Sequence, residues 1–349
     1  MVKVIWITDD DCFVDLLLFV PLRATRSEYA TVSVEGVPMA LDSATTAFLA
    51  QMAEAGGPAL HEMTPQEARE MSDGFIELVG EGPEMARVEN ITVPSTNGYQ
   101  VPVRVLVPSD APRGFIVYLH GGGWVVGGLD GYDTLGRQLA ERTDCAVAIV
   151  DYRLAPEHTF PAAAEDSWAV LEWAAENSGN YAAADSPLVV AGDSAGGNLS
   201  AVLAQRTVRE AGPRIDLQVL VYPVTDDNFD STSYRDPANE LMLTATSMKW
   251  FWDLYVPDAN DRARWDAAPL KAQSLAGVAP AAVLVAEHDV LHDEGRAYAR
   301  KLAESGVPVR ERVFDGQMHG FFQFVNVLPG AKDGMDYVVD AVNDLLDGK

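Results

Sequence analysis

The sequence contains only two cysteines, Cys12 and Cys145. Two cysteines are too few for the disulfide framework of a small secreted domain, and their spacing does not suit metal ligands. A disulfide scaffold and a cysteine-based metal centre are therefore excluded, and a reducing compartment is the simpler interpretation.

Long hydrophobic runs are also missing. The most apolar N-terminal stretch, residues 13–22, holds Asp15 and is about half as long as the roughly 20 residues that span a bilayer. Lys3 is followed by aspartates at 9–11, where a secretory signal would continue from a basic region into an apolar one. We therefore expect no membrane span, no signal peptide and a cytoplasmic protein.

Positive charge is scarce. The chain has 25 lysines and arginines, six of them lysine, against 52 aspartates and glutamates, and its net charge is -27. Such a field repels nucleic acid and anionic lipid, so a nucleic-acid partner is not expected. The acid excess with few lysines suggests a salt-adapted or GC-rich source, although an ordinary acidic enzyme explains the composition equally well.

With 349 residues and 48% hydrophobic content, the chain can bury a full core in one large domain, with or without a small cap. Residues 1–38 form an N-terminal extension without a helix cap, and the sequence does not define their role. Their apolar side chains are either incidental or cover a patch on the cap or on a partner subunit, as in a homodimer. These side chains are Ile5, Trp6, Phe13, Leu16, Leu17 and Phe19.

Residues 39–87 predict two helices. Asp42 and Ser43 can cap the first, and residues 64–67, with sequence TPQE, combine a capping box with proline at the first helical position. After them, alternating segments within residues 88–107 flank an asparagine-glycine pair, which is typical of a β-hairpin.

From residue 88 the chain predicts an α/β domain. Apolar runs rich in β-branched residues alternate with helical patterns, which favours a mainly parallel sheet covered by helices on both faces. An aromatic-rich segment at 226–269 interrupts the alternation, as a packed excursion or as a pocket wall. The apolar runs lie at 115–119, 146–150, 188–191, 217–222, 282–286 and 307–313.

Ser194 is the candidate nucleophile. It lies in GDSAGG at residues 192–197, directly after one predicted strand and before a helix-forming run. A GxSxG motif in strand-turn-helix context forms an elbow that exposes the serine oxygen, and its glycines allow close backbone approach.

Two further loops supply a candidate base and acid. His319 follows the last predicted strand, and Asp289 follows the strand before it. Asp293 and Asp315 are the weaker choices for the acid, because Asp293 begins the next helix and Asp315 nearly adjoins His319. The order serine, acid, histidine is that of the α/β hydrolases.

A run of three glycines follows the predicted strand at 115–119, in HGGGW at residues 120–124. Such a run can turn backbone N–H groups toward a developing oxyanion. A flexible turn is the alternative, whereas a phosphate-binding loop is excluded because no P-loop lysine and no GxGxxG fingerprint accompany it.

These motifs closely resemble the hormone-sensitive lipase family of bacterial esterases (family IV) over residues from about 41 to near the C-terminus. The resemblance implies the α/β hydrolase fold, ester hydrolysis, and no metal or organic cofactor. It also implies a catalytic domain at 88–349 with a cap, which is made of the N-terminal helices and of the insertion at 226–269. Val290 and His292 depart from the proline and arginine usual in the family. The matching segments are HGGGW at 120–124, YRLAPEH at 152–158, GDSAGGN at 192–198, residues 289–295 and HGF at 319–321.

By this resemblance, Gly122 and Gly123 with Ala195 supply the oxyanion-hole N–H groups; the alanine also follows from its place after the nucleophile. The expected function is hydrolysis of small, short to medium acyl esters through an acyl-enzyme on Ser194. The plant gibberellin receptors resemble the same family but lack the catalytic histidine, and His319 argues against that binding role. An amidase and an interfacial lipase remain alternatives. The expected pocket residues are Trp124, Trp250, Phe251, Tyr255 and Phe321.

Overall fold

The computed structural model describes residues 2–4, 16–18, 40–183 and 185–348. Within the N-terminal extension, β1 (Val2–Val4) and β2 (Leu16–Leu18) pair antiparallel. The expectation that apolar side chains of residues 1–38 cover a patch or join a partner subunit lies outside the described residues.

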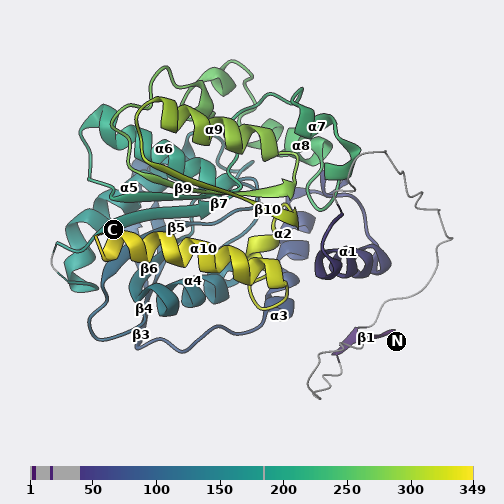
Figure 1. The fold of residues 1–349 in the computed structure, drawn as a ribbon, viewed down its shortest axis with the longest axis horizontal. Coiled ribbons are helices and arrows are strands. Elements are labelled where there is room, and N and C mark those ends of the chain that lie inside the picture. Colours follow the sequence, from purple (N-terminus) through teal and green to yellow (C-terminus); the bar gives the residue numbers. More distant parts are fainter. Residues whose placement is uncertain (1, 5–15, 19–39, 184, 349) are drawn as a thin grey trace.

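The centre of the protein is a twisted eight-stranded sheet (Figure 1). Its order is β10-β9-β8-β7-β5-β6-β4-β3, and all neighbours are parallel except the β3/β4 and β4/β6 pairs. This architecture confirms the predicted α/β class. The strand bounds are Arg87–Pro94 (β3), Gln100–Val107 (β4), Gly114–Leu119 (β5), Cys145–Val150 (β6), Leu188–Asp193 (β7), Leu217–Val221 (β8), Ala281–His288 (β9) and Val309–Met318 (β10).

The β3/β4 hairpin forms at the asparagine-glycine pair. Asn97 and Gly98 have φ angles of 57° and 77°, a left-handed conformation that asparagine and glycine tolerate better than other residues. The turn pairs Pro94 with Gln100 and thereby sets the register of both strands.

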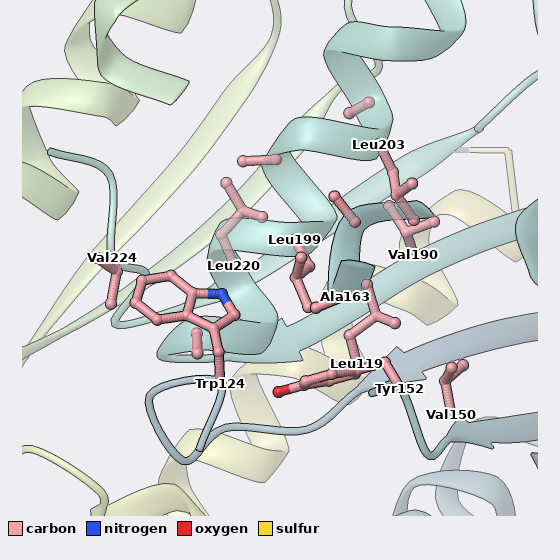
Figure 2. Close-up of a cluster of buried hydrophobic side chains, with 14 of the residues drawn as sticks. Leu119, Trp124, Val150, Tyr152, Ala163, Val190, Leu199, Leu203, Leu220 and Val224 are labelled. Atoms are coloured by element: carbon pink, nitrogen blue, oxygen red, sulfur yellow. The ribbon is translucent and has the colours of Figure 1, made fainter. Parts of the chain in front are cut away.

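Helices cover both faces of the sheet, which explains why the central strands are apolar without alternation. Val117 and Leu119 of β5 face one core, shared with α5 (Ala162–Asn177), α6 (Ala195–Glu210) and α9 (His292–Glu304). Ile116 and Tyr118 face the other, shared with α4 (Leu129–Thr143) and α10 (Pro329–Leu346). Figure 2 shows the first core, with Leu199 of α6 packed over the strands.

Two segments lie at the end of the sheet to which β10 points (Figure 1). The first comprises α1 (Ser43–Ala55), η1 (Leu60–Glu62), α2 (Pro65–Asp73) and α3 (Phe75–Val79); Asp42 caps α1, and Thr64 and Glu67 form the predicted capping box. The second runs between β8 and β9 and contains α7 (Thr232–Arg235) and α8 (Ala245–Tyr255). In the described part of the chain, no helix has both the length and the apolarity needed to cross a bilayer.

Candidate active site

Ser194 occupies a sharp turn between β7 and α6. Its backbone has φ 54° and ψ −115°, a conformation that an L-residue adopts only where the surrounding structure imposes it. A Cβ at Gly192 would overlap the backbone of Gly196, and a Cβ at Gly196 would overlap the carbonyl of Leu119. The two glycines therefore permit the close packing of strand and helix that the elbow requires.

His319 and Asp289 follow the neighbouring parallel strands β10 and β9, so both lie at the edge of the sheet where β7 ends in the turn that carries Ser194. His319 Nε2 is 3.0 Å from Ser194 Oγ, and His319 Nδ1 is 2.7 Å from Asp289 Oδ2. Asp289 is fully buried, and its Oδ1 accepts a hydrogen bond from the N–H of Leu291 at 2.9 Å. The structure thus brings the three candidate residues into one hydrogen-bonded chain.

The order of donors and acceptors in this hydrogen-bonded chain suits nucleophilic catalysis. When His319 is neutral and its Nδ1 proton is directed at Asp289, its Nε2 is free to accept the Ser194 proton. A hydroxyl is a weak nucleophile unless a base removes its proton as it attacks. The arrangement can therefore carry out acyl transfer.

The glycine loop after β5 lies beside Ser194. Gly122 and Gly123 have φ angles of 105° and 58°, and both line the same cavity as Ser194 and His319. Ala195 is the first residue of α6, so its N–H has no acceptor within the helix. The N–H groups at these three positions are candidates to bind a developing oxyanion.

A buried carboxylate anchors the start of this loop. Asp193 Oδ1 accepts hydrogen bonds from the Tyr118 hydroxyl and the N–H of Gly121, and its Oδ2 accepts one from the Tyr132 hydroxyl, each at 3.0 Å. Burial raises the pKa of Asp193 to about 6, although these donors and nearby His319 lower it. Because Gly121 begins the glycine run, Asp193 fixes where the loop leaves the sheet. Its one sequence signal is its place directly before the serine.

A cavity of about 690 Å³ contains Ser194, Gly122 and His319 in its wall. The rest of the wall is mainly apolar, and no lysine or arginine of the described residues lines it. The apolar lining comes from both segments at the end of the sheet and includes Leu49, Met52, Ala53, Leu60, Met71, Phe75, Leu241, Met242, Leu243 and Phe251. Within the described residues, no three histidine, cysteine, aspartate or glutamate side chains are arranged to hold a metal ion.

Of the five aromatic residues expected at the pocket, only Phe251 lines this cavity. Trp124 and Tyr255 are fully buried and stack on each other with ring centroids 4.2 Å apart. Figure 2 shows Trp124 beside Val224, within the core. The physical reason is that the glycine loop turns back at Trp124, whose φ is 60°, and buries the indole against α8.

Phe321 and Trp250 likewise do not line this cavity. Phe321 is fully buried, and its ring lies 5.8 Å from that of Tyr222, which in turn lies 4.6 Å from the His319 ring. Trp250 packs edge-on against Phe251, with centroids 5.1 Å apart, outside the cavity lining. The Trp250 ring supports Phe251 from behind, and the Phe321 ring contacts Tyr222.

Comparisons with known proteins find relatives of this chain in both sequence and structure. A profile of the α/β hydrolase fold family matches residues 116–323. The chain is 35% identical to an ethyl acetate hydrolase of Pseudomonas putida over 321 residues, which cover 88% of this chain and all of that protein. It is 40% identical to carboxylesterase NlhH of Mycobacterium tuberculosis over 257 residues, or 72% of this chain and 80% of that one. The crystal structure of a thermostable esterase from Pseudomonas putida superposes with a TM-score of 0.83 at 34% identity, over 89% of this chain and 99% of that one.

Proposed function

This chain belongs to the hormone-sensitive-lipase-like esterases of the α/β hydrolase fold family and is a serine esterase, and we propose that Ser194 is its nucleophile, His319 the general base and Asp289 the carboxylate that orients the base. The observation that carries the assignment is the chain of hydrogen bonds from Asp289 through His319 to Ser194 at the wall of an apolar cavity.

Catalysis proceeds in two acyl-transfer steps. Ser194 Oγ attacks the ester carbonyl while His319 Nε2 takes its proton, and the resulting oxyanion accepts hydrogen bonds from the N–H groups of Gly122, Gly123 and Ala195. His319 then returns the proton to the leaving alcohol, which leaves an acyl-enzyme on Ser194. Water repeats the attack with His319 as base, and the carboxylic acid and free serine result.

The substrates are small neutral esters with short to medium acyl chains. An apolar wall favours an uncharged substrate, and a cavity of about 690 Å³ has the size of a site for one small molecule. The name of the ethyl acetate hydrolase relative points the same way. Residues 39–87 and the 226–269 insertion act as a cap over the catalytic domain, since both contribute cavity-lining residues.

Ser194→Ala tests the nucleophile. Activity on a soluble short-chain ester should fall by about 10⁴-fold or more with the fold intact, and an organophosphate should label Ser194 alone. Residual activity within about tenfold of wild type, or label on another residue, contradicts the assignment. A parallel panel with an anilide and a triglyceride emulsion separates an esterase from an amidase and from an interfacial lipase.

The acid is tested by a matched pair of substitutions. Asp289→Asn should lower kcat by about 10⁴-fold, because the amide no longer holds the histidine in the required tautomer. Asp293→Asn keeps an acceptor oxygen for the N–H of Ser233, which donates to Asp293 Oδ2 at 2.9 Å, and should stay within about tenfold of wild type. A larger loss at Asp293 would transfer the role of the acid to that residue.

A further inference from the structure

The turn that carries Asp289 connects β9 to α9. Inside the turn, the N–H of Leu291 donates to Asp289 Oδ1 at 2.9 Å and the N–H of His292 donates to the Asp289 carbonyl at 3.1 Å. These bonds set the shape of the turn but do not tie it to the rest of the protein.

A serine from the 226–269 insertion ties the turn down. The Ser233 hydroxyl donates to the carbonyl of Val290, the residue after the acid, at 2.7 Å, and it accepts from the N–H of Asp293 at 3.3 Å. The Ser233 N–H donates to Asp293 Oδ2 at 2.9 Å. Ser233 is 5% exposed, so water cannot readily replace these bonds. Ser233 therefore bonds to both sides of the turn, at Val290 and at Asp293.

The same serine is joined to the wall of the cavity. Asn239, which is also buried, donates from Nδ2 to the Ser233 carbonyl at 2.9 Å, and the N–H of Leu241 donates to the Asn239 carbonyl at 2.9 Å. Leu241 and Met242 line the cavity. A short hydrogen-bonded path therefore runs from the substrate cavity to the turn that bears the acid.

We infer that Ser233 is a positioning residue for the esterase reaction: it holds the turn at residues 289–293 so that the Asp289 carboxylate stays aligned with His319. The inference rests on the proposed roles of Asp289 and His319. The bond from Asp289 Oδ2 to His319 Nδ1 is 2.7 Å long, and its direction fixes the imidazole plane that faces Ser194. A shift of the turn by about 1 Å would turn the base away from the serine proton.

Ser233→Ala removes the hydroxyl that joins Val290 to Asp293. We expect kcat to fall by about ten- to 100-fold with KM nearly unchanged, as misplacement of a catalytic group by about 1 Å does. Ser247→Ala is the matched control: Ser247 lies in the same insertion and is 2% exposed, and among the described residues its hydroxyl bonds only to Thr244 at the start of α8. Its kcat should stay within about twofold of wild type. An unchanged kcat in Ser233→Ala, an increase in KM alone, or an equal loss in Ser247→Ala overturns the inference.

A double-mutant cycle separates positioning from general destabilisation. In an Asp289→Asn background, adding Ser233→Ala should cost less than about twofold, because the group it positions is already lost. A further tenfold loss there shows that Ser233 does not act through Asp289 and overturns the inference. Ser233→Thr keeps the hydroxyl and should restore at least half of the lost kcat; no recovery in a folded Ser233→Thr protein counts against the inference.

Asp293→Ala covers the case in which Ser233→Ala does not fold. It removes the acceptor of the Ser233 N–H at a position that is not fully buried, and should lower kcat by about three- to tenfold without changing KM. A wild-type kcat in that variant overturns the inference. Failure of the proposed function can be told apart from failure of this inference. If the proposed triad is wrong, Asp289→Asn and Ser194→Ala remain active. If only the role of Ser233 is wrong, both of those variants are inactive.

Discussion

Gly123 is the position at which one added methyl group should most directly disable the glycine loop after β5, which we propose binds the oxyanion. Its φ is 58°, in the left-handed region, and a Cβ built on it would lie 2.5 Å from Phe251 Cε1 and closer still to two other atoms of that ring. Phe251 is 4% exposed on α8 and packs against Trp250, so the ring has little room to move. In Gly123→Ala the loop itself must shift.

Gly123→Ala should affect both the stability of the protein and its kcat. Alanine in the left-handed region costs roughly 1–2 kcal/mol, which lowers the free energy of unfolding modestly. Displacing one oxyanion donor costs about 10²–10³ in kcat, or about 2.7–4 kcal/mol of transition-state stabilisation. Because the donors act mainly on the developing charge, we expect kcat to fall by this factor while KM changes little.

The assay is steady-state hydrolysis of a soluble short-chain chromogenic ester, together with the melting temperature. Gly131→Ala is the control, since a Cβ there meets no heavy atom within 4 Å and the residue lies within α4. Gly123→Ala combined with Phe251→Ala should recover part of the lost kcat because the overlapping ring is gone. A kcat for Gly123→Ala within about threefold of wild type would refute the assignment of this loop as an oxyanion donor.

Asp166 is fully buried and accepts two hydrogen bonds from the Arg153 guanidinium, at 2.7 and 2.6 Å, so Asp166→Ala leaves a buried cation unpaired and should cost about 3–5 kcal/mol. At about 2 °C per kcal/mol this lowers the melting temperature by about 6–10 °C, and a loss under 2 °C in a thermal melt would contradict it. Burial, with a smaller contribution from Asp130, raises the pKa of Asp151 to about 6. Because this pKa is higher in the folded protein than in the unfolded chain, the protonated carboxyl group stabilises the fold below about pH 4, and this stabilisation is lost as the pH rises through about 6. Asp151→Asn should therefore raise the melting temperature at pH 8 and leave it unchanged at pH 4. An equal change at both pH values would exclude titration of Asp151 as the cause. With a net charge of -27, screening of self-repulsion should hold or raise the melting temperature in molar sodium chloride, and a steep fall would count against salt adaptation.

Local sequence pattern determines much of this protein. The strand runs, the capping box at α2 and the turn around Asn97 depend on a few adjacent residues, so their signals can be read directly from the chain. The candidate triad is also legible, because parallel strands place their following loops at one edge of the sheet. A serine, an acid and a histidine that each follow a strand therefore meet there, as the distances at Ser194, Asp289 and His319 show.

Only the tertiary structure decides which side chains form the cavity and which support the site. Phe251 and Trp252 are adjacent on α8, yet Phe251 lines the cavity while Trp252 packs on the buried Trp124, because successive helical residues point about 100° apart. Aromatic composition cannot predict that division, which depends on how α8 is rotated against the sheet. Ser233 and the turn after Asp289 are likewise more than 50 residues apart and meet through the packing of the insertion. A contact between distant segments produces no periodic pattern in the sequence, because each of the two residues taken alone resembles an ordinary loop residue. Such a contact therefore cannot be predicted from the sequence.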